Sequence, residues 1–99
     1  MRKALDKTEL DAALQRLPEW QVVEGKLSRE FRFRDFADAF AFMTACALRI
    51  HALDHHPEWS NVYSSVRVQL VTHDAGGITT RDLELAGVME ETASRFARA

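Results

Sequence analysis

Histidine is the residue of this sequence best placed to do chemistry. All four histidines lie between positions 51 and 73, and His51, His55 and His56 fall within six residues of one another. The ordinary pKa of an imidazole lets it both accept and release a proton near neutral pH. The cluster therefore predicts proton transfer or metal binding, and the plain alternative is a helix end that exposes imidazoles to solvent.

A metal site is the first functional alternative. His51 and His55 are four residues apart and would share a face at a helix end, with His73 or Glu58 completing the ligand set. The helical zinc motif, however, has glutamate directly after its first histidine, where this sequence has Ala52, and no cysteine accompanies the group. The motif argument therefore disfavours a metal site, and it leaves proton transfer and a solvent-exposed helix end as the open alternatives.

Caps and apolar spacing predict three helices that position these residues. The first is short and stops at Pro18, the longest runs from Phe36 to Leu53, and the last reaches the end of the sequence. The longest helix is apolar on two neighbouring sides, so we expect part of it, or a sheet edge, to be buried against another subunit. One side contains Phe36, Phe40, Met43, Ala47 and Ile50, and the other contains Ala39, Phe42, Cys46 and Leu53. The expected caps are Thr8 with Asp11, Asp35, and Thr79 with Asp82.

Two hairpins are predicted from the alternation of apolar and polar residues. The first joins 20–22 to 27–33 through a turn at Glu24-Gly25-Lys26, and the second joins 59–63 to 66–72 through Ser64-Ser65. Because hairpins pair their strands antiparallel, the order α-β-β-α-β-β-α predicts an α+β fold. We expect a four-stranded antiparallel sheet with three helices packed on one face, and the opposite face free.

Composition predicts one domain that spans residues 1–99. The chain has 46% hydrophobic and 28% charged residues and a net charge of -2, with no basic patch for nucleic acid. The start, MRKALDKTEL, lacks the apolar segment of a signal peptide, so we expect a cytoplasmic protein without membrane binding. The lone cysteine, Cys46, stands in an alanine-rich stretch and is expected to be buried, not reactive.

The segment that begins at His51 is part of a longer pattern. It reads His51-Ala-Leu-Asp54-His55-His56-Pro57-Glu58-Trp59-Ser-Asn61-Val62-Tyr63, and Thr72-His73 and Arg81-Asp82 follow. Nine residues separate Tyr63 from His73, and eight separate His73 from Asp82. In residue type and spacing this string resembles the signature of the pterin-4a-carbinolamine dehydratases. Upstream, the resemblance includes Trp20, Glu24-Gly25, 31–36 and 39–43, so that only the first helix is generic.

The resemblance implies dehydration of 4a-hydroxytetrahydropterin to quinonoid dihydropterin, which recycles the cofactor of aromatic amino-acid hydroxylases. It implies that His55, His56 and His73 are the acid–base catalysts and that no metal is needed. We assign His73 and His56 as opposite proton carriers, and His55 to orienting the substrate or serving the other C4a epimer. The implied supporting residues are Trp20, Pro57, Glu58, Thr72 and Asp82.

Several of these residues have a second interpretation. Asp82 also fits the cap of the last helix, and Trp20 could serve as core or as an aromatic wall for a flat pterin. For Trp59 we favour a core position, and His51 is interpreted as the rim of the pocket. Ala75 stands where animal members of the family can carry a cysteine.

The resemblance also implies partners. Family members are commonly dimers or tetramers, and animal members act as dimerisation cofactors for a homeodomain transcription factor. A non-catalytic binding module is therefore the alternative function, and it would tolerate loss of the histidines that catalysis needs. The sequence leaves open which pterin side chain is physiological and whether an aromatic amino-acid hydroxylase is the working partner.

Overall fold

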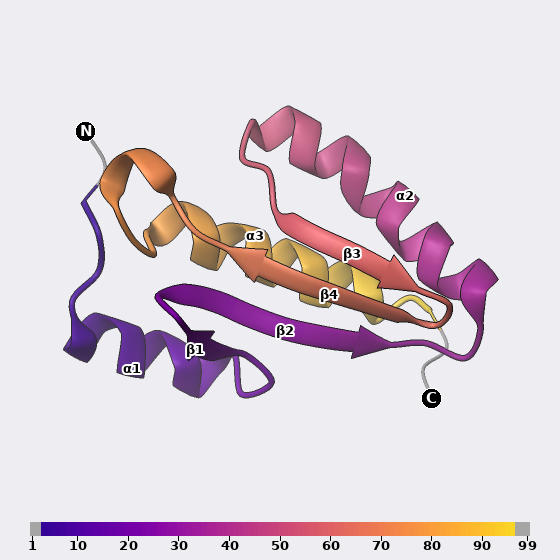
Figure 1. Ribbon diagram of the computed structural model, residues 1–99, viewed down its shortest axis with the longest axis horizontal. Helices are drawn as coiled ribbons and strands as arrows, with labels where there is room; N and C mark the ends of the chain where they lie inside the picture. The colour runs from indigo at the N-terminus through magenta and orange to yellow at the C-terminus, as the bar shows by residue number, and fades with distance from the viewer. Residues whose placement is uncertain (1–2, 97–99) are drawn as a thin grey trace.

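The order of the elements follows the prediction (Figure 1). The structure is a computed structural model that describes residues 3–96. Its elements are α1 (Lys7–Arg16), β1 (Gln21–Val23), β2 (Lys26–Arg32), α2 (Phe36–Leu53), β3 (Glu58–Val62), β4 (Ser65–Leu70), the short 3-10 helix η1 (His73–Ala75) and α3 (Thr80–Ala93). The predicted α+β class and the order α-β-β-α-β-β-α are confirmed. The prediction that the last helix reaches the end of the sequence was wrong over 94–96, because α3 ends at Ala93, and 97–99 lie outside the described residues.

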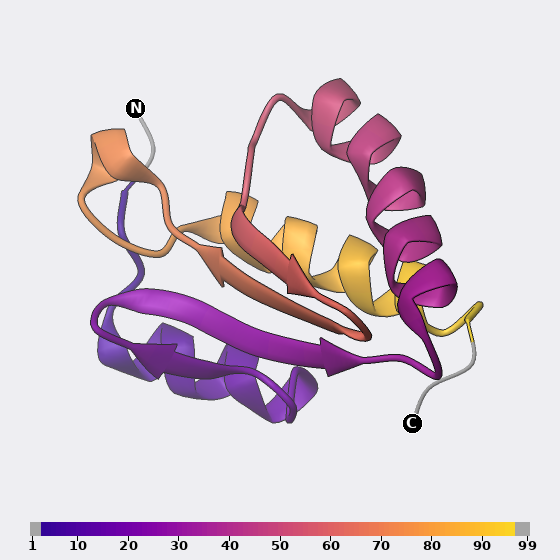
Figure 2. The same cartoon turned by 45° about the vertical axis from the view of Figure 1, so that its right-hand side comes forward.

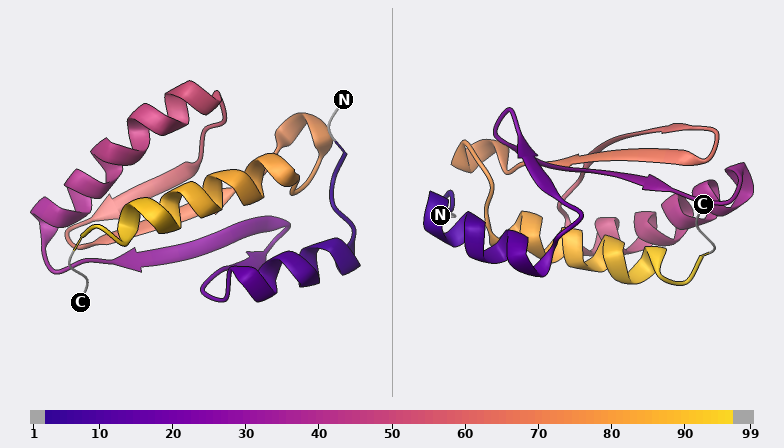
Figure 3. Two further views of the ribbon diagram at one scale, coloured as in Figure 1. Left: turned by 180° about the vertical axis from the view of Figure 1, so that it is seen from behind. Right: turned by 90° about the horizontal axis from the view of Figure 1, so that it is seen from below.

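The four strands form one antiparallel sheet in the order β1-β2-β4-β3. Viewed from below, in the right panel of Figure 3, the sheet makes one layer and the helices lie on one side of it. Side chains alternate between the two faces along each strand. Leu27 of β2 pairs with Leu70 of β4, and both are fully buried beneath the helices. Within residues 3–96, the opposite face, which carries the intervening positions, is not covered by a helix.

Aromatic side chains from β2, from the residue that follows it and from α2 fill the centre of the core. The ring centroids of Phe31 and Phe42 are 4.9 Å apart, and Phe33 lies at the same distance from Phe42. Cys46 is fully buried one helical turn further along α2, as predicted. Burial raises the pKa of the Cys46 thiol to about 11, so the thiol is a packing group.

Two of the three expected helix caps are confirmed. Asp35 precedes α2 and accepts a hydrogen bond from the Asp38 main-chain N–H at 2.9 Å. Thr79 and Asp82 form the predicted capping box of α3. The predicted α1 cap was wrong, because the helix starts one residue before Thr8.

The box at α1 is made by Asp6 and Glu9, which bond each other's main-chain N–H at 2.8 and 2.9 Å. Both this pair and the pair of Thr8 with Asp11 have the three-residue spacing of a capping box. Glutamate has one methylene more than aspartate and reaches back to the N-cap N–H, which favours the earlier start.

The turns between strands are two-residue turns. Glu24 and Gly25 have φ of 52° and 79° between β1 and β2, as this kind of hairpin requires. In the second hairpin Val62 pairs with Ser65, which leaves Tyr63 and Ser64 in the turn, and Tyr63 has a φ of 50°. The predicted turn at Ser64-Ser65 was therefore wrong by one residue.

The two apolar sides of α2 are buried to different extents. Its buried residues are Ala39, Phe42, Cys46 and Ile50, whereas the side chains of Phe36 and Phe40 are 47% and 55% exposed. Within residues 3–96, α2 alone is long and apolar enough to cross a membrane by length and composition, a test that core helices also pass. Here it packs on the sheet, and within residues 3–96 the part of its second apolar side around Phe36 and Phe40 stays uncovered.

Candidate active site

The predicted site residues other than Trp20 come from three segments that meet at one end of the sheet. Figure 2 shows the chain leaving α2 and returning to β3 at the end where β4 stops and η1 begins. The N-terminus of α3 lies at the same end. Hydrogen bonds between side chains of these segments, described below, hold them together.

His55 is buried and fixed by a carboxylate that is itself buried. Its Nε2 lies 2.5 Å from Oδ1 of Asp82, a residue with no exposed surface. The other oxygen, Oδ2, accepts hydrogen bonds from the Thr72 hydroxyl at 2.9 Å and from the Thr79 main-chain N–H at 2.8 Å. Asp82 therefore completes the capping box of α3 and also contacts the His55 ring.

The two donors to Oδ2 of Asp82 bear on which ring nitrogen of His55 carries the proton. Hydrogen bonds from the Thr79 N–H and the Thr72 hydroxyl stabilise the negative charge of the Asp82 carboxylate. A carboxylate is only an acceptor, so Nε2 of His55 is the protonated nitrogen of the neutral ring and Nδ1 is left to accept. This is the arrangement in which a carboxylate orients an imidazole for proton transfer.

His73 has a carboxylate of its own on the open side of the sheet. Its Nε2 lies 3.1 Å from Oε2 of Glu58, and Lys26 donates from Nζ to the other oxygen at 2.6 Å. The Lys26 hydrogen bond holds the pKa of Glu58 below its usual range, with a smaller contribution from His73. Glu58 is thus an ionised acceptor, and the exposed His73 ring keeps Nδ1 free in its neutral form.

His56 lies between the two anchored positions. On one side of it in the sequence, His55 is linked to Thr72 through the carboxylate of Asp82. On the other side, Glu58 contacts His73 directly. The segments 55–58 and 72–73 are therefore clamped at two points. His56 itself is exposed, and within residues 3–96 no hydrogen bond holds its side chain.

The end of α2 is fixed by Arg81, a residue for which the sequence analysis predicted no role. Its Nη2 donates to the carbonyl oxygens of Leu53 at 3.2 Å and Asp54 at 2.6 Å. Asp54 then takes a left-handed conformation with φ 53°, and Pro57 disfavours a helical conformation at the residue before it. Arg81 and Pro57 together define where the His55-His56 segment starts and stops.

The structure does not join Trp20 to the histidines. Trp20 is 4% exposed, and its Nε1 donates to Oε2 of Glu90 on α3 at 2.8 Å. Glu90 also pairs with Arg29, whose guanidinium lies 4.1 Å from the centre of the Phe31 ring. Trp20 is thus a core residue with a satisfied indole N–H. Trp59 is partly buried against the core.

The residues considered as metal ligands contact different partners and do not point to one common position. Nε2 of His55 is directed to Asp82 and Nε2 of His73 to Glu58, and His51 is exposed on the last turn of α2. In the part of the chain that the structure describes, no three histidine, cysteine or acidic side chains gather as a metal site would need.

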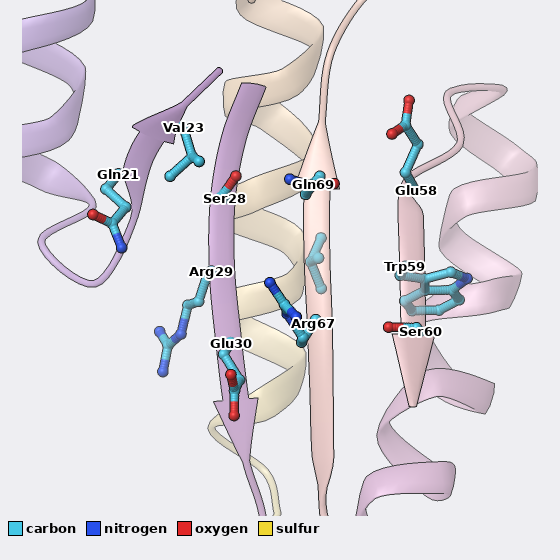
Figure 4. A pocket seen from close by; sticks show the side chains of 11 residues that line it. Gln21, Val23, Ser28, Arg29, Glu30, Glu58, Trp59, Ser60, Arg67 and Gln69 are labelled. Carbon is cyan, nitrogen blue, oxygen red and sulfur yellow. The ribbon is translucent and has the colours of Figure 1, made fainter. Parts of the chain in front are cut away.

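The uncovered sheet face carries a hollow of about 500 Å³ beside this site. Figure 4 shows one row of its side chains, Gln21, Ser28, Gln69 and Glu58, contributed by neighbouring strands. The hollow contains no histidine, and Glu58 is the residue that it shares with the candidate site. A ligand held by the histidines would therefore have this polar surface on one side.

Comparison with known proteins supports the family resemblance that was based on the sequence. The family described as "Pterin 4 alpha carbinolamine dehydratase" matches residues 3–92. A Solibacter usitatus protein is 48% identical over 94 residues, which cover 95% of this chain and 99% of the relative. A protein of Afipia carboxidovorans is 54% identical over 87 residues, with 86% and 87% covered. Both carry the name "Putative pterin-4-alpha-carbinolamine dehydratase".

A solved structure supports the same assignment. The "Crystal structure of transcriptional coactivator/pterin dehydratase from Brucella Melitensis" superposes with a TM-score of 0.88 at 43% identity. The match covers 92% of this chain and 99% of that chain. The family match and the relatives each extend over most of the sequence, including 55–58, Thr72-His73 and Asp82. The chain belongs to the pterin-4-alpha-carbinolamine dehydratase family.

Proposed function

We propose that this protein dehydrates 4a-hydroxytetrahydropterin to quinonoid dihydropterin by histidine acid–base catalysis, without a metal or an organic cofactor. One observation carries the proposal. At one end of the sheet, two imidazoles each have Nε2 beside a carboxylate, His55 with Asp82 at 2.5 Å and His73 with Glu58 at 3.1 Å. Oriented imidazoles of this kind are what a reaction with two proton transfers requires.

The reaction needs one acid and one base. The acid protonates the hydroxyl group on C4a, the C4a–O bond breaks, and the hydroxyl leaves as water. The base takes the proton from N5, and the electron pair of the N5–H bond forms the C=N bond of the quinonoid product. One proton is given and one is taken, so two histidines in opposite protonation states complete the cycle.

His73 and His56 are the two proton carriers in this proposal. Both rings are exposed, so that they reach a bound substrate and exchange protons with solvent between turnovers. His55 is buried and fixed by Asp82, which suits a residue that orients the substrate or serves the other C4a epimer. Glu58 fixes His73 in the same manner from the open side.

The test is the rate at which chemically generated 4a-hydroxytetrahydropterin loses water, followed by ultraviolet absorbance with a chelator present. We expect the wild type to accelerate the spontaneous reaction, and His56→Ala and His73→Ala to lower kcat about 10²-fold or more. Gln15→Ala, on the exposed side of α1, is the control and keeps the wild-type rate. Near-normal turnover in both histidine variants would refute the assignment, and loss of activity with chelator would favour a metal site.

A binding function is the second candidate, favoured by the similarity to a Brucella protein named as a transcriptional coactivator and by the uncovered side of α2. The rings of Phe36 and Phe40 lie 5.7 Å apart there, and their side chains are 47% and 55% exposed. We propose that this side is covered by another copy of the chain in a homodimer or homotetramer. Sedimentation equilibrium should give a multiple of 11.3 kDa for the wild type and a lower mass for Phe40→Ser. A monomeric wild type would contradict this.

A further inference from the structure

Lys26 connects two strands that are not neighbours in the sheet. It is the first residue of β2, and β4 lies between β2 and β3. Leu27 and Trp59 face the helices, so the residues before them, Lys26 and Glu58, lie on the open face. The Lys26 side chain reaches past the end of β4 and donates to Glu58 at 2.6 Å.

The two oxygens of Glu58 have different partners. Oε1 accepts from Nζ of Lys26, and Oε2 lies 3.1 Å from Nε2 of His73. A carboxylate held at one oxygen presents the other in a defined direction, whereas one held only by an exposed imidazole is free to rotate. Lys26 is therefore the group that fixes the plane of the carboxylate to which His73 binds.

We propose that Lys26 is a positioning residue of the active site, which acts through Glu58 to hold the His73 imidazole with Nδ1 free for proton transfer. The proposal rests on the proposed dehydration. Lys26 does not touch the reacting atoms in this arrangement. Lys26 orients Glu58, and Glu58 orients the His73 ring. Residues that hydrogen-bond to the partner of a ligating or catalytic histidine commonly act in this way.

The effect should appear in catalysis and not in stability. The side chains of Lys26 and Glu58 are 32% and 40% exposed, and ion pairs of this kind contribute little to the folded state. The charged groups nearest Glu58 are Lys26 from β2 and His73 from η1. One step further along the open face, Arg67 of β4 is paired across the strands with Glu30 and Ser60.

The first measurement is the titration of Glu58, followed by the carbon-13 shift of its carboxyl group in the full-length protein. In Lys26→Met we expect the pKa of Glu58 to rise toward its ordinary value, because the hydrogen bond from Lys26 is the main cause of its lowering. The matched control is Lys7→Met, which removes a lysine that pairs with Asp11 at 2.9 Å on α1. An unchanged Glu58 titration in Lys26→Met would overturn the proposal.

The second measurement is turnover of the carbinolamine. We expect kcat of Lys26→Met to fall about tenfold with KM unchanged, the size of effect that residues behind a catalytic group produce. Lys26→Arg should recover most of the loss, and the melting temperature of Lys26→Met should stay within about 3 °C of the wild type. The Lys7→Met control keeps the wild-type kcat.

A double-mutant cycle separates action through Glu58 from other roles. In a Glu58→Gln background, Lys26→Met should have no further effect on kcat, because its target is already gone. An equal loss in both backgrounds, or full activity of Lys26→Met alone, would refute the proposal. If the wild type itself does not accelerate dehydration, the proposed function fails, whereas the Glu58 titration still decides whether Lys26 holds the carboxylate.

Discussion

Replacing Asp82 by asparagine keeps the size of the side chain but puts a donor where a fully buried acceptor stood. The amide oxygen takes the place of Oδ2, because the Thr79 N–H and the Thr72 hydroxyl both donate there. The amide NH₂ then points at His55, 2.5 Å away in the wild type. Two donors face each other unless the His55 ring moves its proton from Nε2 to Nδ1.

The cost in stability follows from the contacts. Asp82→Asn loses one charge-assisted buried hydrogen bond, about 2 kcal/mol, which lowers the melting temperature of a domain of this size by about 10 °C. Asp82→Ala removes the acceptor for all three donors together with the helix cap, about 4 kcal/mol. The order expected is therefore wild type, then Asn, then Ala.

Catalysis should respond to the same change. With Nδ1 protonated, His55 no longer offers its free nitrogen to the substrate, and kcat of Asp82→Asn should fall at least about tenfold under the proposed mechanism. Urea denaturation followed by circular dichroism gives the stability, and the absorbance assay gives kcat. The control is Glu84→Gln, which neutralises an exposed carboxylate two residues further along α3. An Asp82→Asn variant as stable and active as Glu84→Gln would refute the reasoning.

Three further predictions rest on single contacts. Cys46 should react slowly with a thiol reagent in the folded protein and rapidly in denaturant, since burial raises its pKa to about 11. Arg81→Met should lose about 1 kcal/mol in urea denaturation, because the carbonyls of Leu53 and Asp54 lose their donor. The folded-state pKa of Glu58 is depressed, so its ion pair stabilises above pH 4.5 and that contribution is lost as pH falls through the lowered value. The small difference in melting temperature between wild type and Glu58→Gln should therefore shrink as pH falls from about 5 through the lowered pKa of Glu58.

The local features of the fold could be predicted because their signals are short-range. The bounds of α2 agree with the sequence to the residue, since Asp35 supplies the cap and apolar residues recur at helical spacing up to Leu53. Where two patterns compete within a few residues, the prediction fails. Asp6 rather than Thr8 begins α1, and one added pair in the second hairpin moves its turn to Tyr63.

The contacts that orient the site depend on long-range geometry that spacing does not encode. His55 and Asp82 are 27 residues apart, and Lys26 and Glu58 are 32 apart. Whether such pairs meet depends on the strand order and on the rotation of α3 against the sheet. The family resemblance made His55, Glu58 and Asp82 candidate site residues, but Lys26 lies outside the quoted pattern and has no local signal of its proposed role.

The two carboxylates that contact the histidines, Asp82 and Glu58, lie in different surroundings. Because of this difference, we expect changes at the two positions to affect stability and turnover differently. Asp82 is fully buried and also caps a helix, so any change there should cost both folding and turnover. Glu58 is partly exposed and is held by Lys26 across an uncovered sheet face, so changes there should cost turnover and only a small part of the stability. A loss of kcat without loss of stability in Lys26→Met, beside a loss of both in Asp82→Asn, would identify orientation of the imidazoles as the common cause. If both variants instead lost activity only in proportion to their loss of folded protein, the carboxylates would serve the fold and not the reaction.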